Sequence, residues 1–205
     1  MAKPLFALAA GVRLVLASGS PRRRQFLEEW GVPFEVRPAP AEPQPLPGER
    51  PDDHVLRSAC AKLAAAGRGP GEVVVAADTV VAHAGHILGK PRDDAEALAM
   101  LLELSGTDHT VSTGVAVALP DGSSRSFVDT CTVTFHAWPR DLLAAYVATG
   151  ECRDKAGAYA IQGIGAFLVE KVHGSWSTVV GLPVPRLAAL LMVGGLIVPA
   201  VPAKE

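Results

Sequence analysis

A run of hydroxyl, proline and arginine side chains near the start of the chain has the composition of a phosphate-binding turn. It reads Ser18-Gly19-Ser20-Pro21-Arg22-Arg23-Arg24 and follows an apolar run over 12–17. Ser20 is a good helix N-cap, and Pro21 suits the first helical position, where a missing N–H costs nothing. A helix start exposes unpaired N–H groups and the positive end of the helix dipole. Because basic residues are unfavourable there, three arginines favour a bound phosphate over an ordinary capped helix.

An acidic residue follows a strongly apolar run further along. Residues 72–77, EVVVAA, predict a buried strand, and we expect Asp78 at its end. Ligands of open α/β sheets bind outside the carboxyl ends of strands. A carboxylate at that place can hold a divalent metal or accept a proton from water. An aspartate that only caps the following turn is the alternative, and the residues alone leave both open.

Two lysines and a glycine-rich stretch complete the candidates. Lys90 lies in a loop, Gly89-Lys90-Pro91, and is a point charge suited to a phosphate, or else a surface lysine. Lys62 lies beside the buried face of an expected helix, where it either reaches a ligand or extends to solvent. Residues 154–163, DKAGAYAIQG, contain small residues that let backbone approach a ligand, and Gln162 could read a base edge. A glycine-rich loop without a ligand is the alternative there.

The elements that would position these residues indicate an α/β protein with a mixed sheet. We expect a helix after Pro21 and four more over 52–67, 93–104, 140–148 and from about 185. We expect strands over 12–17, 72–77, 109–119, 126–135, 167–172 and 176–180, with 79–81 and 87–88 as a short hairpin. The proline-rich segment 37–51 predicts an extended connector. Strands and helices without regular alternation favour a mixed sheet, in two lobes.

Composition excludes several classes of protein. The 205 residues include 19 basic and 21 acidic side chains, a net charge of −2, which argues against a broad nucleic-acid-binding face. Three widely spaced cysteines fit neither a disulfide framework nor a zinc site, so we expect a reducing cytoplasm. Arg13 interrupts the first apolar segment, and the last one, 187–200, is shorter than the roughly 20 residues of a membrane-spanning helix. We therefore expect no membrane partner.

Taken together, these motifs resemble those of the Maf family of nucleoside triphosphate pyrophosphatases. The matching segments, in the family's order, are 16–23, 77–81, 88–93, 104–106 with His109 and Thr113, 154–163 and 181–183. The resemblance implies a mixed, bent sheet with flanking helices around a central cleft, as in inosine triphosphatases. It implies one two-lobed domain over 14–193, with an N-terminal extension over 1–13 and a C-terminal tail over 194–205.

The resemblance also implies an activity and the residues that perform it. The reaction would be hydrolysis of a nucleoside triphosphate to the monophosphate and diphosphate, with magnesium or manganese. Asp78 matches the family's proton acceptor, and Arg23, Thr79 and Gln162 match positions tied to substrate choice. Side chains expected to bind the substrate phosphates or line the cleft are Ser18, Ser20, Arg22, Lys62, Lys90, Asp154 and Lys155.

The form of residues 158–163, AYAIQG, resembles the branch of the family that acts on dTTP and UTP. The sister branch acting on 7-methyl-GTP and a non-catalytic, nucleotide-binding septation inhibitor are the alternatives. Ala160 departs from the family, which usually has glycine there. Glu42 is the nearest match to an acidic metal ligand beside Asp78. A homodimer is a further expectation from the resemblance.

Overall fold

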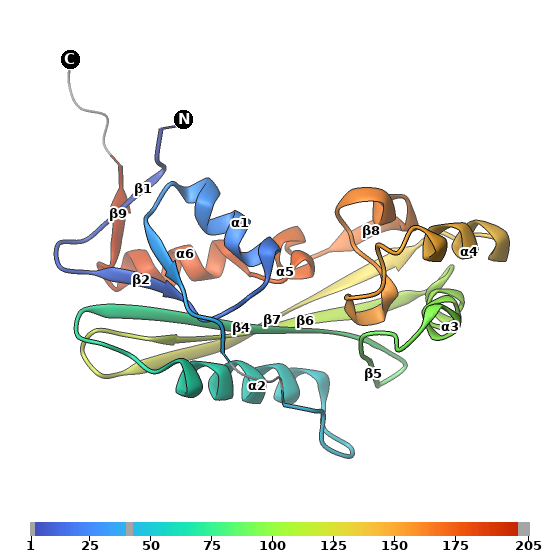
Figure 1. The fold of residues 1–205 in the computed structure, drawn as a ribbon, viewed down its shortest axis with the longest axis horizontal. Helices are drawn as coiled ribbons and strands as arrows, with labels where there is room; N and C mark the ends of the chain where they lie inside the picture. The colour runs from blue at the N-terminus through green and yellow to red at the C-terminus, as the bar shows by residue number, and fades with distance from the viewer. Residues whose placement is uncertain (1–2, 40–42, 201–205) are drawn as a thin grey trace.

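A seven-stranded mixed sheet forms the centre of the protein, as a computed structural model that describes residues 3–39 and 43–200 shows (Figure 1). The strand order is β3-β2-β4-β6-β7-β8, and β5 pairs with β4 outside this path. The strands are β2 (Arg13–Leu16), β3 (Phe34–Val36), β4 (Glu72–His83), β5 (His86–Leu88), β6 (Asp108–Ala118), β7 (Ser124–Phe135) and β8 (Val169–His173). The expected mixed α/β architecture is therefore confirmed.

Helices cover both faces of this sheet (Figure 1). They are α1 (Pro21–Trp30), α2 (Pro51–Ala66), α3 (Asp94–Leu104), α4 (Arg140–Ala148), α5 (Trp176–Val180) and α6 (Val184–Val193), with 3₁₀ turns η1 (Ala156–Ala158) and η2 (Gly163–Leu168). Alternate side chains of a strand point to opposite faces. Val73 and Val75 of β4 accordingly pack with α1 and α6, whereas Val74 and Ala76 face α2.

The buried side chains form two large clusters along the length of the sheet. One contains the first part of β4 with α1 and α6, and the other contains Val81 and Leu88 with α3 and α4. The long strands β4, β6 and β7 pass from one end of the sheet to the other (Figure 1). They join two halves that each have an apolar core.

Strand β4 does not end at Asp78 as expected. It continues to His83, because β6 pairs with it from Val74 to Ala82. The other edge of β4 is shared by two short strands: β2 ends opposite Val75, and the antiparallel β5 ends opposite Val81. Asp78 therefore lies inside a strand, between the ends of β2 and β5. The Asp78 side chain has space there because β2 ends at Leu16 and the chain continues as a loop.

The expected strands over 167–172 and 176–180 are also partly wrong. Residues 163–168 form η2, so β8 begins only at Val169, and residues 176–180 form α5. The tryptophan, threonine and valines of that segment favour strands only where a pleated surface is available to pack on. Here Gly181, at φ +119°, ends a short helix whose last turn is buried.

The segments outside 14–193 lie side by side. β1 (Phe6–Leu8) pairs antiparallel with β9 (Ile197–Pro199) (Figure 1). The Ile197 side chain is buried in the core that also contains α6. Within residues 3–39 and 43–200, no helix combines the length and apolar composition needed to cross a membrane.

Gly114 allows helix α2 to lie directly on the sheet. It pairs with Asp78 in the β4–β6 ladder, and a Cβ added there would lie 2.4 Å from the carbonyl oxygen of Val55 in α2. That distance is far shorter than any van der Waals contact. The atoms that the Cβ would meet belong to the backbone of Val55 and Leu56, so they cannot turn aside as a flexible side chain could. A side chain at this position would push α2 away from the sheet.

We therefore expect Gly114→Ala to destabilise the protein by about 1–3 kcal/mol, as overpacking of a core does. Urea unfolding of the variant would measure this loss. Gly89→Ala is the control, because a Cβ there meets open space and the backbone needs no positive φ. Equal stability of the two variants would contradict the close approach of α2.

Candidate active site

A cavity of about 690 Å³ opens beside the part of β4 that lies between β2 and β5. Its wall includes every residue expected to bind or act on a substrate, except Glu42, which lies outside the described residues. These are Ser18, Ser20, Arg22, Arg23, Lys62, Asp78, Thr79, Lys90, Asp154, Lys155 and Gln162. Segments more than a hundred residues apart in sequence therefore meet at one place.

The loop before α1 forms one wall of the cavity. Helix α1 begins at Pro21 with Ser20 in the N-cap position, yet the Ser20 side chain makes no capping hydrogen bond. Instead, the Ser18 hydroxyl accepts a hydrogen bond from the Ser20 N–H at 3.2 Å. The expected helix start is thus confirmed, but the hydroxyl that organises it belongs to Ser18.

Arg23 ties this loop to the rest of the site. Its guanidinium donates to the Ser18 hydroxyl at 3.0 Å, the Thr79 hydroxyl at 3.0 Å and the Gly181 carbonyl at 2.7 Å. The residue is only 8% exposed. Arg23 therefore joins the loop, β4 and the end of α5, in addition to lining the cavity.

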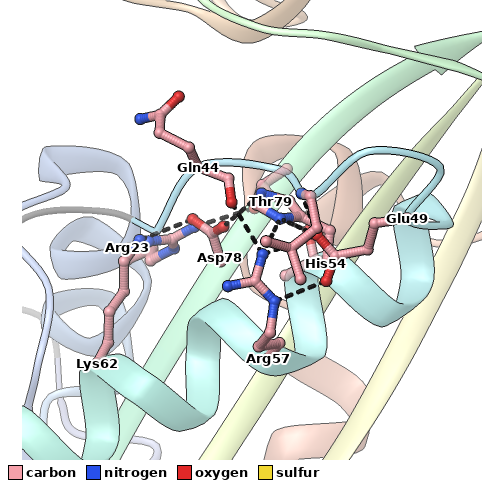
Figure 2. A network of polar contacts seen from close by, with 10 residues as sticks. Arg23, Gln44, Glu49, His54, Arg57, Lys62, Asp78 and Thr79 are labelled. Atoms are coloured by element: carbon pink, nitrogen blue, oxygen red, sulfur yellow. Dashed lines mark hydrogen bonds and ion pairs between the residues drawn. The ribbon is translucent and has the colours of Figure 1, made fainter.

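Helix α2 places a cation against Asp78 (Figure 2). The Lys62 ammonium lies 2.7 Å from Asp78 Oδ1, and His54 Nε2 lies 3.9 Å from Asp78 Oδ2. All three residues are buried, so Lys62 does not extend to solvent. A carboxylate buried in this way needs such a partner, since an unpaired buried charge is very costly.

A second layer of charges lies behind His54, and the sequence analysis missed it (Figure 2). The Arg57 guanidinium donates to both carboxylate oxygens of Glu49, at 2.6 and 2.7 Å. These hydrogen bonds lower the pKa of Glu49 to about 2. Glu49 Oε2 in turn lies 3.1 Å from His54 Nδ1. In the sequence, the four-residue spacing of His54, Ser58 and Lys62 was the signal that His54 lies on the same helix face as Lys62.

Glu151 organises the loop that contains Gln162, and it was also missed. Its carboxylate accepts hydrogen bonds from the Ile164 N–H at 2.9 Å, the Gly165 N–H at 2.8 Å and the Tyr146 hydroxyl at 3.0 Å. The backbone just after Gln162 is thereby held to the start of the 151–155 turn. Nothing in the residue spacing singles out this glutamate, because its partners are mostly backbone groups.

The same turn brings further charges to the cavity wall. The Lys155 ammonium donates to Asp154 at 2.5 Å and to the Glu151 carbonyl at 2.8 Å. The hydrogen bond from Lys155 lowers the pKa of Asp154. Gly157, at φ +67°, lies so close to β4 that a Cβ would come within 2.9 Å of the Val81 side chain. Glycine is therefore needed for η1 to reach the sheet.

A buried polar pair supports the wall behind this loop. The Tyr159 hydroxyl lies 2.9 Å from His109 Nε2, and both rings pack edge-on against Phe135. Burial lowers the pKa of His109 to about 4 and raises that of Tyr159. Both groups are consequently neutral near pH 7, and Tyr159 presents an uncharged ring to the cavity.

The cavity wall thus combines two kinds of surface. Cationic side chains of Arg22, Lys62, Lys90 and Lys155 suit a polyanion. Apolar side chains of Ile161, Val179 and Val180, with the Tyr159 ring, suit a flat ring system. The amide of Gln162 offers a donor and an acceptor beside them.

The carboxylates of the cavity fit a cation that a phosphate ligand helps to hold. Within the described part of the chain, no group of three or more His, Cys, Asp or Glu side chains converges as a metal cage does. Magnesium is commonly bound by one or two carboxylates, with substrate phosphates completing its shell. Asp78 is the carboxylate so placed, beside a wall suited to phosphates.

Known proteins resemble this chain over most of its length. The family model described as Maf-like protein matches residues 13–193. A dTTP/UTP pyrophosphatase of Nitratidesulfovibrio vulgaris is 55% identical over 90% of this chain and 89% of its own length. The dTTP/UTP pyrophosphatase of Anaeromyxobacter dehalogenans strain 2CP-C is 50% identical over 91% of this chain and 96% of its own.

A solved structure of a HAM1 protein from Coxiella burnetii matches with a TM-score of 0.44 and 16% identity, over 62% of this chain and 75% of that one. Because the family model spans residues 13–193 and relatives of high identity cover nearly the whole length, the chain belongs to the Maf family.

Proposed function

We propose that this protein is a nucleoside triphosphate pyrophosphatase that hydrolyses dTTP and UTP to the monophosphate and diphosphate. One observation carries the proposal: the arginine-rich turn, Asp78 and the Gln162 loop line a single cavity. That cavity offers cationic side chains to bind a triphosphate, a carboxylate to accept a proton from water, and an apolar wall to contact a nucleobase. The names of relatives that are 49–55% identical agree with it.

In the proposed reaction, water attacks the α-phosphorus. A bond forms between the water oxygen and that phosphorus, and the bond from phosphorus to the bridging oxygen breaks. Diphosphate leaves with the bonding electron pair, and the Asp78 carboxylate takes the proton of the water. Arg22, Lys90 and Lys155, which line the cavity, stabilise the negative charge that grows on the departing diphosphate.

Asp78 is also the residue that would hold a divalent cation such as magnesium or manganese. A bound cation would supply charge neutralisation of the phosphates and a more acidic water. The Lys62 ammonium donates to Oδ1 of this carboxylate, and His54 Nε2 lies 3.9 Å from Oδ2.

We also propose that the reaction takes place in the cytoplasm. Cys60, Cys131 and Cys152 are all free thiols, as expected in a reducing compartment. The homodimer expected from the family resemblance stays a prediction.

Asp78→Asn should lower kcat for dTTP by about 10²–10⁴-fold, the usual contribution of a general base, while nucleotide binding persists. Diphosphate release with magnesium measures kcat, and equilibrium titration measures binding. Asp53→Asn, an exposed position on α2, is the control. Full turnover in Asp78→Asn would remove Asp78 from the mechanism. A wild-type protein that releases no diphosphate from dTTP or UTP would refute the proposed function.

Arg22→Ala should reduce kcat/KM for dTTP by about 10–100-fold, because it removes charged hydrogen bonds to the phosphates that are worth roughly 1.5–3 kcal/mol. Arg24→Ala is a matched control on the same turn. Arg24 is exposed and paired with Glu28, outside the cavity wall. Equal losses in the two variants would show only a general charge effect.

Gln162→Ala should change the ratio of kcat/KM for dTTP against GTP and 7-methyl-GTP more than it changes the rate for the best substrate. The reason is that an amide reading a base edge discriminates by pairing. A panel of nucleoside triphosphates with diphosphate detection measures the ratio. A uniform loss on every nucleotide would mean that Gln162 does not contact the base.

A further inference from the structure

A chain of hydroxyl groups leads from the cavity into the core. Thr79 of β4 and Thr113 of β6 are directly paired in the sheet, and their hydroxyl oxygens lie 2.9 Å apart. Thr79 lines the cavity, whereas Thr113 is completely buried. The Thr113 hydroxyl also lies 2.8 Å from the carbonyl oxygen of Thr178 in α5.

The directions of these hydrogen bonds follow from the number of protons. Each hydroxyl has one proton, and a carbonyl can only accept. Thr113 therefore gives its proton to the Thr178 carbonyl, and it must accept the proton of Thr79. Arg23 Nη2 donates to the same Thr79 oxygen at 3.0 Å. What Thr79 can still offer to a ligand is a lone pair, not a proton.

The inner end of this chain is firmly held. The Thr178 hydroxyl donates to Asp129 at 2.5 Å, and the Gly181 N–H donates to the Thr178 carbonyl at 3.1 Å. Thr178 is completely buried. Reversing the chain would break the bond between Thr113 and Thr178, so the order that makes Thr79 an acceptor is the favoured one.

Thr79 lies on the part of the wall that suits a base. Its guanidinium partner, Arg23, also bonds Gly181, the residue after the apolar Val179-Val180 pair of α5. Val179, Val180 and Gln162 line the same cavity. A Cβ added at Gly181 would lie 3.3 Å from the Thr79 hydroxyl oxygen, so this oxygen lies beside the end of α5.

We propose that Thr113 is a specificity-determining positioning residue, which fixes the Thr79 hydroxyl as an acceptor toward the nucleobase. The site then favours a base with an N–H at that point, such as the imide N–H of uracil and thymine. Cytosine has a bare lone pair at the same ring position and would face the Thr79 oxygen unfavourably. This inference rests on the proposed function.

The test compares UTP with CTP, which differ in this donor and acceptor pattern, in wild-type protein and in Thr113→Val, Thr113→Ser and Thr110→Val. Valine matches the shape of threonine but removes the acceptor for the Thr79 proton, which is then released toward the cavity. Serine keeps the hydroxyl. Thr110 is the matched control on β6, because its hydroxyl bonds only the Ala82 carbonyl in the described structure.

We expect Thr113→Val to lower the UTP to CTP ratio of kcat/KM by about tenfold, the effect of one misdirected hydrogen bond. Thr113→Ser should restore the wild-type ratio, and Thr110→Val should leave it unchanged. An unchanged ratio in a folded Thr113→Val protein, or the same shift in Thr110→Val, would overturn the inference. Because the wild type is assayed alongside, lack of activity there would count against the proposed function instead.

Discussion

The buried pairing of Asp78 with Lys62 is the interaction on which the rest of the site depends. A carboxylate in the middle of a strand, 8% exposed, is tolerated only if an opposite charge is held close to it. Helix α2 supplies that charge, and it must lie directly on the sheet to do so. Gly114, the partner of Asp78 in the next strand, provides the space. The pairing of these two buried charges therefore depends on the close packing of α2 against the sheet.

The strand pairing explains why a ligand can reach this carboxylate. β4 is supported along its length by β6, but its other edge is shared by β2 and β5, which stop short of each other. The loop before α1 leaves the sheet where β2 ends. The two faces of β4 have different partners: Asp78 faces Lys62 of α2, and Thr79 faces Arg23 and the end of α5.

Two charged side chains of the cavity wall are held in place by several hydrogen bonds each. Arg23 bonds a hydroxyl of the loop before α1, a hydroxyl of β4 and the carbonyl of the residue after α5, so it maintains the shape of the cavity. Glu151 does the same for the Gln162 loop by accepting three hydrogen bonds. Fixed donors and acceptors of this kind are what electrostatic stabilisation of a transition state requires, since they need no reorganisation during the reaction.

The amino-acid sequence by itself determined the element types of most of the chain, the chemistry of the arginine-rich turn and the membership of Asp78, Lys90 and Gln162 in one set of motifs. Local signals suffice for these, because helix starts, apolar runs and turns depend on neighbouring residues. Only the tertiary structure decided that Asp78 lies inside a long strand, that residues 176–180 are helical, and that His54, Glu49 and Glu151 belong to the site. Each of these depends on partners far away in the chain: the pairing of β4 with β6, the packing of α5, and hydrogen bonds to backbone groups that carry no signature in the sequence.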